Sequence, residues 1–328
     1  LVGSEMCIRD RSKLLLNELN VDRIEIASAR VSDGELKAVQ EVSQWAQNTG
    51  LLKRIEILTF VDGCTSIDWM VKSGAKVQNL HTKGSLNHLK HQLKKTPDQH
   101  FKAIEEHVLT AQKEGISTNV YLEDWSNGMR NSQGYVNDYL SFVSTLPIKR
   151  VLLPDTLGVM TYYETFSFIS EVVKSFPEIH FDFHGHNDYD LSVPNAIEAV
   201  RAGCHGLHLT VNGMGERAGN TPMASTVANL KDFLHDVEIN INESSLYKVS
   251  KLVATFTGFR IPANKPIVGQ NVFTQTAGIH ADGDKKKNLY FNDLLPERFG
   301  RTREYALGKT SGRANIQKNL QKLGINLN

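Results

Sequence analysis

The feature that most constrains the fold is a repeated alternation of short, largely apolar strand segments with amphipathic helical segments. Strands that alternate with helices in this way form a parallel sheet, because each helix returns the chain to the start of the next strand. The sequence contains about seven such strand–helix units. The predicted strands lie at 21–27, 55–60, 76–80, 116–122, 149–153, 179–184 and 205–211.

Local signals place the helices between these strands. The helix after the first strand is capped near Ser32 and carries Leu36 and Val39 on its apolar face. A longer helix opens at Thr96-Pro97 and stops at Gly115, in keeping with the preference for proline at helix starts and glycine after helix ends. Further helices are predicted at 12–19, 66–73, 132–144, 161–175, 192–202, 222–235, 244–256 and 312–323.

These units predict an α/β fold, a (β/α)₈ TIM barrel that lacks its first strand. Eight units close such a barrel, and the lone helix at 12–19 is what remains when the first strand is cut away. A doubly wound open sheet is the alternative, but no Gly-x-Gly-x-x-Gly follows the first strand. Residues 240–328 break the alternation and include a charged loop at 282–287, which predicts an appended, mostly helical C-terminal subdomain.

Residues 1–11, LVGSEMCIRDR, do not fit this organisation because they show neither a strand nor a helix period. We interpret them as a foreign segment, so that the native N-terminus is missing. The predicted domains are then an N-terminally truncated TIM-barrel catalytic domain at 12–239 and a linker subdomain at 240–328, without a regulatory domain.

Composition excludes several classes of partner. The 37 Lys and Arg residues nearly cancel the 36 Asp and Glu residues, so nothing indicates a nucleic-acid or membrane surface. Cys7, Cys64 and Cys204 have no disulfide-framework spacing, which is typical of a reducing cytosol. No stretch has the length and apolar character of a membrane span, and there is no signal-peptide pattern. The sequence therefore predicts a soluble, cytoplasmic protein.

The segment His184-Gly185-His186-Asn187-Asp188 ends the predicted strand at 179–184. Residues two apart in a strand point to the same face, so His184 and His186 project together and can share one metal ion. The alternative is two histidines with local hydrogen bonds at a strand end. Polar residues also end nearly every other predicted strand, and in a barrel these ends face the active site. They are Glu25, Asn79, Glu123, Asp124, Asp155, Thr156 and Asn212. A set of His, Asn and carboxylate groups without thiolates suits Mg²⁺, Mn²⁺ or Zn²⁺.

Three motifs together resemble one enzyme family. HGHND ends one predicted strand, NGMGERAGN follows the next, and LGKTSGR lies near the C-terminus. They are similar to the 2-isopropylmalate, homocitrate and citramalate synthases, a family of acyl-transferring barrel enzymes with 3-hydroxy-3-methylglutaryl-CoA lyases as more distant relatives. The resemblance runs from about residue 12 to the end, and the chain looks most like the 2-isopropylmalate synthases.

The resemblance implies that His184 and His186 bind a divalent metal with Asn220 as an oxygen ligand. It also implies a catalytic role for Glu25, which would support the family's catalytic arginine, and for Glu123, near the acyl donor.

Three further candidates complete the predicted site. Thr156 matches the threonine that hydrogen-bonds the keto acid, and Asn79 is a second candidate substrate-binding residue. His280, in a predicted mobile loop between two glycines, matches a catalytic histidine that the C-terminal subdomain lowers over the barrel mouth.

Each of these residues has a plainer alternative role. Glu25 can be an ordinary buried carboxylate paired with an arginine, and Thr156 and Asn79 can satisfy backbone groups at strand ends. Asn220 can cap a helix that starts at Thr221-Pro222, and His280 can be solvated.

One departure from the family pattern matters most. The family's first strand ends in Arg-Asp-Gly, which supplies the catalytic arginine and a metal-binding aspartate. Here the only Arg-Asp pair is Arg9-Asp10, which lies too close to Glu25 for a strand, loop and helix to fit between them. We assign that pair no catalytic role and expect the chain as given to be inactive.

The activity that the resemblance implies is a metal-dependent condensation of acetyl-CoA with 2-oxoisovalerate to 2-isopropylmalate and CoA, the first committed step of leucine biosynthesis. Pyruvate or 2-oxoglutarate as the acceptor would give citramalate or homocitrate instead. A non-catalytic, metal-binding fragment is the alternative from another class. The expected partners are these small molecules and a second copy of the chain in a homodimer.

Overall fold

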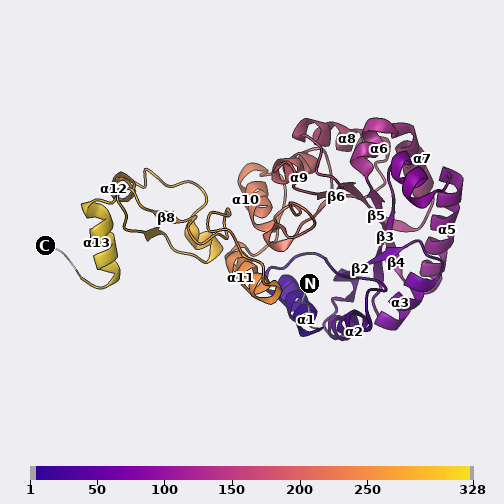
Figure 1. The fold of residues 1–328 in the computed structure, drawn as a ribbon, viewed down its shortest axis with the longest axis horizontal. Coiled ribbons are helices and arrows are strands. Elements are labelled where there is room, and N and C mark those ends of the chain that lie inside the picture. Colours follow the sequence, from indigo (N-terminus) through magenta and orange to yellow (C-terminus); the bar gives the residue numbers. More distant parts are fainter. Residues whose placement is uncertain (1–4, 326–328) are drawn as a thin grey trace. The chain divides into compact units, whose positions relative to one another are not determined.

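The computed structural model describes residues 5–325 and divides into two compact units, Leu1–Thr226 and Val227–Asn328. In the first unit, seven parallel strands form one curled sheet in sequence order (Figure 1). The strands are β1 (Ile24–Ser28), β2 (Ile55–Phe60), β3 (Val77–Lys83), β4 (Ser117–Glu123), β5 (Ile148–Asp155), β6 (Phe181–Gly185) and β7 (Gly206–His208).

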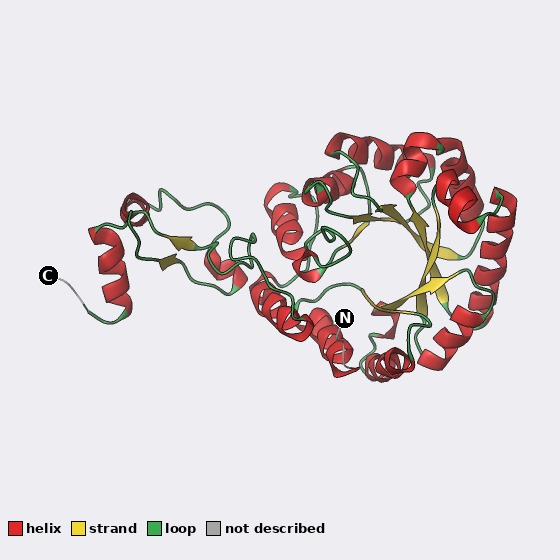
Figure 2. Ribbon diagram, in the orientation of Figure 1, coloured by secondary structure: helices red, strands yellow, loops and turns green. Residues whose placement is uncertain are grey.

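Helices cover the outer face of this sheet, so that the strands form the inner wall of the first unit (Figure 2). They are α1 (Glu5–Lys13), η1 (Leu14–Glu18), α2 (Asp33–Asn48), α3 (Thr65–Ser73), α4 (Leu86–His88), η3 (Leu89–Leu93), α5 (Pro97–Lys113), α6 (Trp125–Asn131), α7 (Gln133–Val143), α8 (Tyr162–Ser175) and α9 (Ser192–Arg201), with short η2 (Leu52–Arg54) and η4 (Val211–Gly213) turns. Helix α10 (Met223–Phe233) follows.

The predicted TIM-barrel architecture without its first strand is confirmed. Each predicted strand has its counterpart, and β1 and β7 are the two edges of the sheet within residues 5–325. The helix capped by Ser32 and the helix opened by Thr96 and Pro97 both form, with the side chains of Ser32 and Thr96 accepting hydrogen bonds from the first turn.

The first helix is longer than the sequence pattern indicates. It begins at Glu5, and Arg9 lies 3.6 Å from Glu41 of α2 in an ion pair. Most of the segment 1–11 is therefore the start of the helix predicted at 12–19, while residues 1–4 lie outside the described residues. The interpretation of that segment as foreign stays a prediction.

Alternation along the strands separates an apolar outer face from a polar inner face. The outward residues are buried in one cluster with α5, α7 and α8, and include Leu80, Val120, Leu122, Val151, Leu153, Phe181 and Phe183. Their neighbours in sequence point the other way because successive strand residues alternate in direction. The barrel interior therefore contains Asn79, His81, Lys83, Asn119, Tyr121, Glu123, Asp182 and His184.

Register places these inward residues at matching heights. Asn79 pairs with Asn119 and Lys83 with Glu123 across β3 and β4, and His184 pairs with His208 across β6 and β7. Side chains of matched residues on neighbouring parallel strands lie side by side. The interior is thus a stack of polar layers.

An ion-pair network forms the layer near the N-terminal ends of the strands. Arg150 donates hydrogen bonds to Glu56 and, over 2.6 Å, to Asp182, while Arg23 lies 3.1 Å from Asp182. Burial opposes ionisation of Asp182, but its hydrogen bond from His180 and the two guanidinium groups outweigh burial and lower its pKa. Asp182 therefore stabilises the fold above its ordinary pKa, and this contribution is lost as the pH falls through the folded-state pKa.

The second unit contains α11 (Leu246–Thr257), α12 (Gly278–Lys285), α13 (Arg313–Lys322), the turns η5 (Glu243–Ser245) and η6 (Pro296–Phe299), and a two-stranded parallel sheet of β8 (Thr274–Gln275) and β9 (Glu304–Tyr305). It is mostly helical, as predicted, but the charged loop expected at 282–287 is wrong for residues 282–285, because α12 extends through them. Arg298 of η6 forms ion pairs with Asp232 of α10 and Glu243 of η5, at 2.8 Å and 2.9 Å.

Within residues 5–325, no helix combines the length and the apolar character that crossing a membrane requires.

Removing Arg150 should strongly destabilise the first unit, because Glu56 and Asp182 would stay buried with only the more exposed Arg23 as their cation. We expect Arg150→Ala to lower the free energy of unfolding by about 3–5 kcal/mol. Urea unfolding followed by circular dichroism measures the change. Arg201→Ala is the matched control, since Arg201 on α9 is 58% exposed and its pair with Glu198 should contribute less than about 1 kcal/mol. Equal effects of the two variants would contradict the importance of the network.

Candidate metal and acid–base site

The two histidines of the HGHND segment converge at the C-terminal end of β6. Their Nε2 atoms lie 3.4 Å apart. Two nitrogens that each bind a common ion at about 2.1 Å are separated by about 3.0–3.4 Å. The observed spacing of His184 and His186 therefore fits two ligands of one metal ion.

Asn220 completes this group from the loop that follows β7. An isolated bridge pairs its backbone with His186, and its Oδ1 atom is buried without a hydrogen-bond partner among the described residues. Helix α10 begins at Met223, and this oxygen does not cap it. A buried, unpaired amide oxygen beside two imidazoles is a suitable third donor for a divalent ion.

A contact with the neighbouring strand β7 orients the imidazole ring of His184. Its Nδ1 atom lies 2.8 Å from Nδ1 of His208, which in turn lies 2.9 Å from the Tyr121 hydroxyl. This contact occupies Nδ1 of His184 and leaves Nε2 directed at His186. Burial, together with His208 and His186, lowers the pKa of His184 well below its ordinary value, so the ring is neutral, the form that binds metals.

Arg217 of the GERAGN segment holds the surrounding loops together. Its guanidinium donates two hydrogen bonds to Asp188, of 2.7 and 2.9 Å, and one of 2.8 Å to the carbonyl of Thr156. Gly219 permits the turn that leads to Asn220, because it adopts a φ of +90° and a Cβ there would collide with the carbonyl oxygen of Gly213. The glycines of this motif therefore shape the metal-side loop.

The donor set is two imidazoles and one amide oxygen. Among residues 5–325, no group of three or more His, Cys, Asp or Glu side chains is arranged to hold a metal ion. The carboxylate that the family resemblance implies as a further ligand has no counterpart in this group. The residues present nevertheless fit a divalent ion that accepts mixed nitrogen and oxygen ligands.

Thr156 and Asn79 are both occupied by hydrogen bonds to the protein. The Thr156 hydroxyl accepts a 2.8 Å hydrogen bond from the backbone N–H of Asp124 and keeps its own hydrogen for donation. Asn79 is fully buried, and its amide donates to Glu25 over 2.6 Å and to Glu56 over 3.0 Å. Burial raises the pKa of Glu25, although His208 and Asn79 oppose the rise.

Glu123, at the end of β4, faces three nitrogen-bearing side chains. Lys83 of β3 forms a short ion pair with its Oε2 atom. His81 Nε2 lies 3.7 Å and His88 Nδ1 lies 3.9 Å from the same oxygen. The Glu123 side chain keeps 20% of its surface exposed, so a ligand can reach it.

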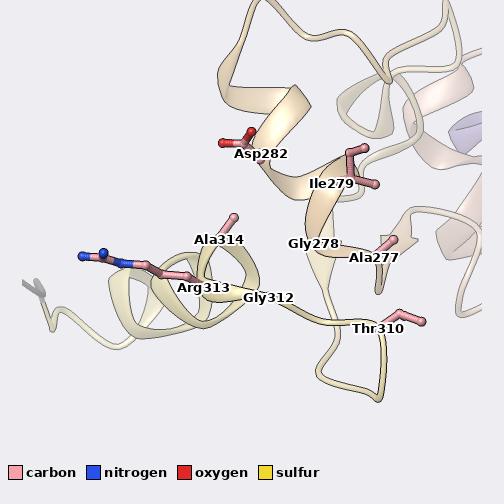
Figure 3. Close-up of a pocket in the computed structure, with 8 residues that line it drawn as sticks. All are labelled: Ala277, Gly278, Ile279, Asp282, Thr310, Gly312, Arg313 and Ala314. Atoms are coloured by element: carbon pink, nitrogen blue, oxygen red, sulfur yellow. The ribbon is translucent and has the colours of Figure 1, made fainter.

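His280 lies in the second unit, where it belongs to α12 rather than to the predicted loop. Its ring packs against Tyr290 with the ring centroids 4.2 Å apart. A pocket of about 620 Å³ opens beside the same helix, between the starts of α12 and α13 (Figure 3). It is lined by Ala277, Gly278, Ile279, Asp282, Thr310, Gly312, Arg313 and Ala314.

Sequence reasoning missed His81, Lys83, His88 and His208. The strand predicted at 76–80 continues to Lys83, and this boundary error placed two inward-facing residues outside the strand. The alternation of Asn79, His81 and Lys83 with outward residues is the signal that could have revealed them.

Comparison with known proteins identifies the family to which the chain is similar. A family model described as HMGL-like matches residues 9–253, and one described as homocitrate synthase post-HMGL domain-like matches residues 267–328. A probable 2-isopropylmalate synthase of Methanopyrus kandleri is 33% identical over 94% of this chain and 60% of its own length. An (R)-citramalate synthase of Methanocaldococcus jannaschii is 32% identical over 95% of this chain and 62% of its own length. The chain thus spans less than two thirds of the length of both relatives.

A solved structure supports the fold independently. The HMG-CoA lyase of Bacillus subtilis superimposes with a TM-score of 0.64 at 16% identity, over 80% of this chain and 90% of its own. The family match covers the whole seven-stranded sheet and includes both HGHND and GERAGN. The chain belongs to the HMGL-like family.

Proposed function

We propose that this chain is the catalytic barrel of a metal-dependent acyltransferase that condenses acetyl-CoA with 2-oxoisovalerate to 2-isopropylmalate and CoA. The observation that supports it most is the convergence of His184, His186 and the unpaired oxygen of Asn220 at the C-terminal ends of the strands. The names of the relatives support condensation with a 2-keto acid but divide between 2-isopropylmalate and citramalate synthases. The product would enter leucine biosynthesis.

In this proposal the imidazoles of His184 and His186 and the amide oxygen of Asn220 hold a Mg²⁺, Mn²⁺ or Zn²⁺ ion. Such an ion polarises a carbonyl group when bound. Thr156 donates its hydroxyl hydrogen to the keto acid. Because Asn79 is fully buried, it orients Glu25 instead of contacting the substrate. Glu25 would support the catalytic arginine that the family's first strand supplies.

Glu123 is the proposed base for the acyl donor. Its carboxylate takes a proton from the methyl group of acetyl-CoA, and the electrons of the broken C–H bond remain on the donor as an enolate. The enolate attacks the keto carbon of the acceptor, and the keto oxygen becomes an alkoxide that takes up a proton. Water then cleaves the thioester to give a carboxylate and free CoA. His280 is the second candidate for proton transfer. We also propose that the chain acts as a homodimer.

The acceptor is proposed to be a branched, monocarboxylic keto acid. A second carboxylate, as in 2-oxoglutarate, requires a cationic partner. The nearest cation after β1 is Arg30, whose guanidinium lies 3.0 Å from Asp62 and over the ring of Phe60 at 5.3 Å. Its charge is already paired, which disfavours homocitrate formation.

Metal binding can be tested without any activity. Titration of the purified protein with Mn²⁺, followed by electron paramagnetic resonance, should reveal one tight site. His186→Ala should weaken Mn²⁺ binding strongly. Loss of a residue that only orients a metal ligand costs roughly 10–100-fold in affinity, and loss of a ligand itself should cost more. His91→Ala is the control, because His91 is exposed on η3. Equal Mn²⁺ affinity in all three proteins would remove the metal site from the proposal.

Substrate choice can be tested in a form of the protein to which an Arg-Asp-Gly first strand has been restored, because we expect the chain as given to be inactive. Release of free CoA from acetyl-CoA is measured there with a thiol reagent. We expect 2-oxoisovalerate to exceed pyruvate in kcat/KM by about 10–200-fold, the range that a few methyl groups provide in an apolar pocket. A preference for pyruvate would instead identify a citramalate synthase. Retained Mn²⁺ binding with no CoA release from any acceptor would favour the non-catalytic alternative.

A further inference from the structure

The ion pair between Lys83 and Glu123 is unusual because it lies inside the barrel. Lys83 is 4% exposed, and buried lysines are rare unless they are paired. Its partner stands opposite it in the register of β3 and β4. Burying two charges costs free energy that a hydrophobic pair would not, so a purely structural role explains this pair poorly.

The backbone around Lys83 is fixed by side chains from two helices. Its N–H donates a 3.2 Å hydrogen bond to Nε2 of His100, and its carbonyl accepts a 2.8 Å hydrogen bond from the Tyr135 hydroxyl. The next residue, Gly84, donates to the carbonyl of Glu123 over 2.7 Å. The ends of β3 and β4 are therefore held together, and the ammonium group is directed at one carboxylate.

The neighbouring charged and titratable groups leave Lys83 as the cation that acts on Glu123. Burial, Lys83 and His88 lower the pKa of His81 to about 4, so His81 is neutral at pH 7. His88 lies 3.5 Å from Asp124 through its other nitrogen. The carboxylate of Asp124 accepts hydrogen bonds from Ser85 and Asn127, which leaves Glu123 as the direct partner of Lys83.

We propose that Lys83 is a positioning residue that keeps Glu123 in its carboxylate form at the barrel mouth, so that Glu123 accepts a proton from the substrate rather than donating one. An adjacent cation stabilises a carboxylate, and a base must be unprotonated before it reacts. This inference rests on the role proposed above for Glu123. Burial also lowers the pKa of Lys83 to about 8, and the charge of Asp124 limits that decrease.

The direct test measures the Glu123 carboxyl group in the full chain without substrates. Carbon-13 NMR of protein labelled at glutamate carboxyl groups gives its titration midpoint, with the signal assigned by its absence in Glu123→Gln. Lys83→Met should raise this midpoint by about 1–3 pH units, because one adjacent opposite charge is lost. Lys83→Arg keeps the charge and should restore the midpoint to near the wild-type value.

Lys90→Met is the matched control, since Lys90 is exposed on η3 and should leave both the midpoint and activity unchanged. A folded Lys83→Met protein with an unchanged midpoint overturns the inference. Where Lys83→Met does not fold, Lys83→Gln replaces it. The wild-type protein provides a second test. A titration midpoint of Glu123 well above the ordinary glutamate value of about 4.3 would overturn the inference.

CoA release separates this inference from the proposed function, provided that it is measured with an Arg-Asp-Gly first strand restored to the wild type and to each variant. The acidic limb of the pH dependence of kcat/KM should shift upward in Lys83→Met by the same amount as the NMR midpoint. No CoA release by the wild type, with a midpoint that still responds to Lys83→Met, rejects the function alone. Normal CoA release with an unresponsive midpoint rejects the role of Lys83 alone.

Discussion

The parallel pairing of β1 to β7 is the constraint on which the rest of this structure depends. Between β3 and β4, and between β6 and β7, it gives the inward-facing side chains neighbours at the same height on the next strand. A barrel interior lined by apolar residues would need no such match, because apolar contacts are not directional. Here the interior is polar, so each donor must meet an acceptor. The register places Asn79 beside Asn119, and the Asn79 side chain also reaches Glu25 on β1.

The polar layers differ in what they contribute. Near the N-terminal ends of the strands, Arg150, Glu56 and Asp182 neutralise one another and stabilise the sheet. Near the C-terminal ends, the groups are less completely satisfied, as the unpaired oxygen of Asn220 shows. Stability and chemistry are thus assigned to opposite ends of the same strands, which is the usual division in TIM barrels.

The loops at the C-terminal end depend on one side chain. Arg217 connects the segment that follows β7 with Asp188, which follows β6, and with Thr156, which follows β5. A bidentate guanidinium–carboxylate pair fixes orientation as well as distance. The order of three loops that carry the candidate site therefore rests on an interaction between two motifs that are distant in sequence.

The sequence by itself determined the strand–helix alternation, the position of every strand core and the pairing of His184 with His186, because periodicity and short-range spacing encode these features directly. Only the tertiary structure decided that β3 runs on to Lys83, that Lys83 meets Glu123, and that His208 lies behind His184. Those contacts join different strands, and their partners depend on register, which no local pattern in the sequence specifies.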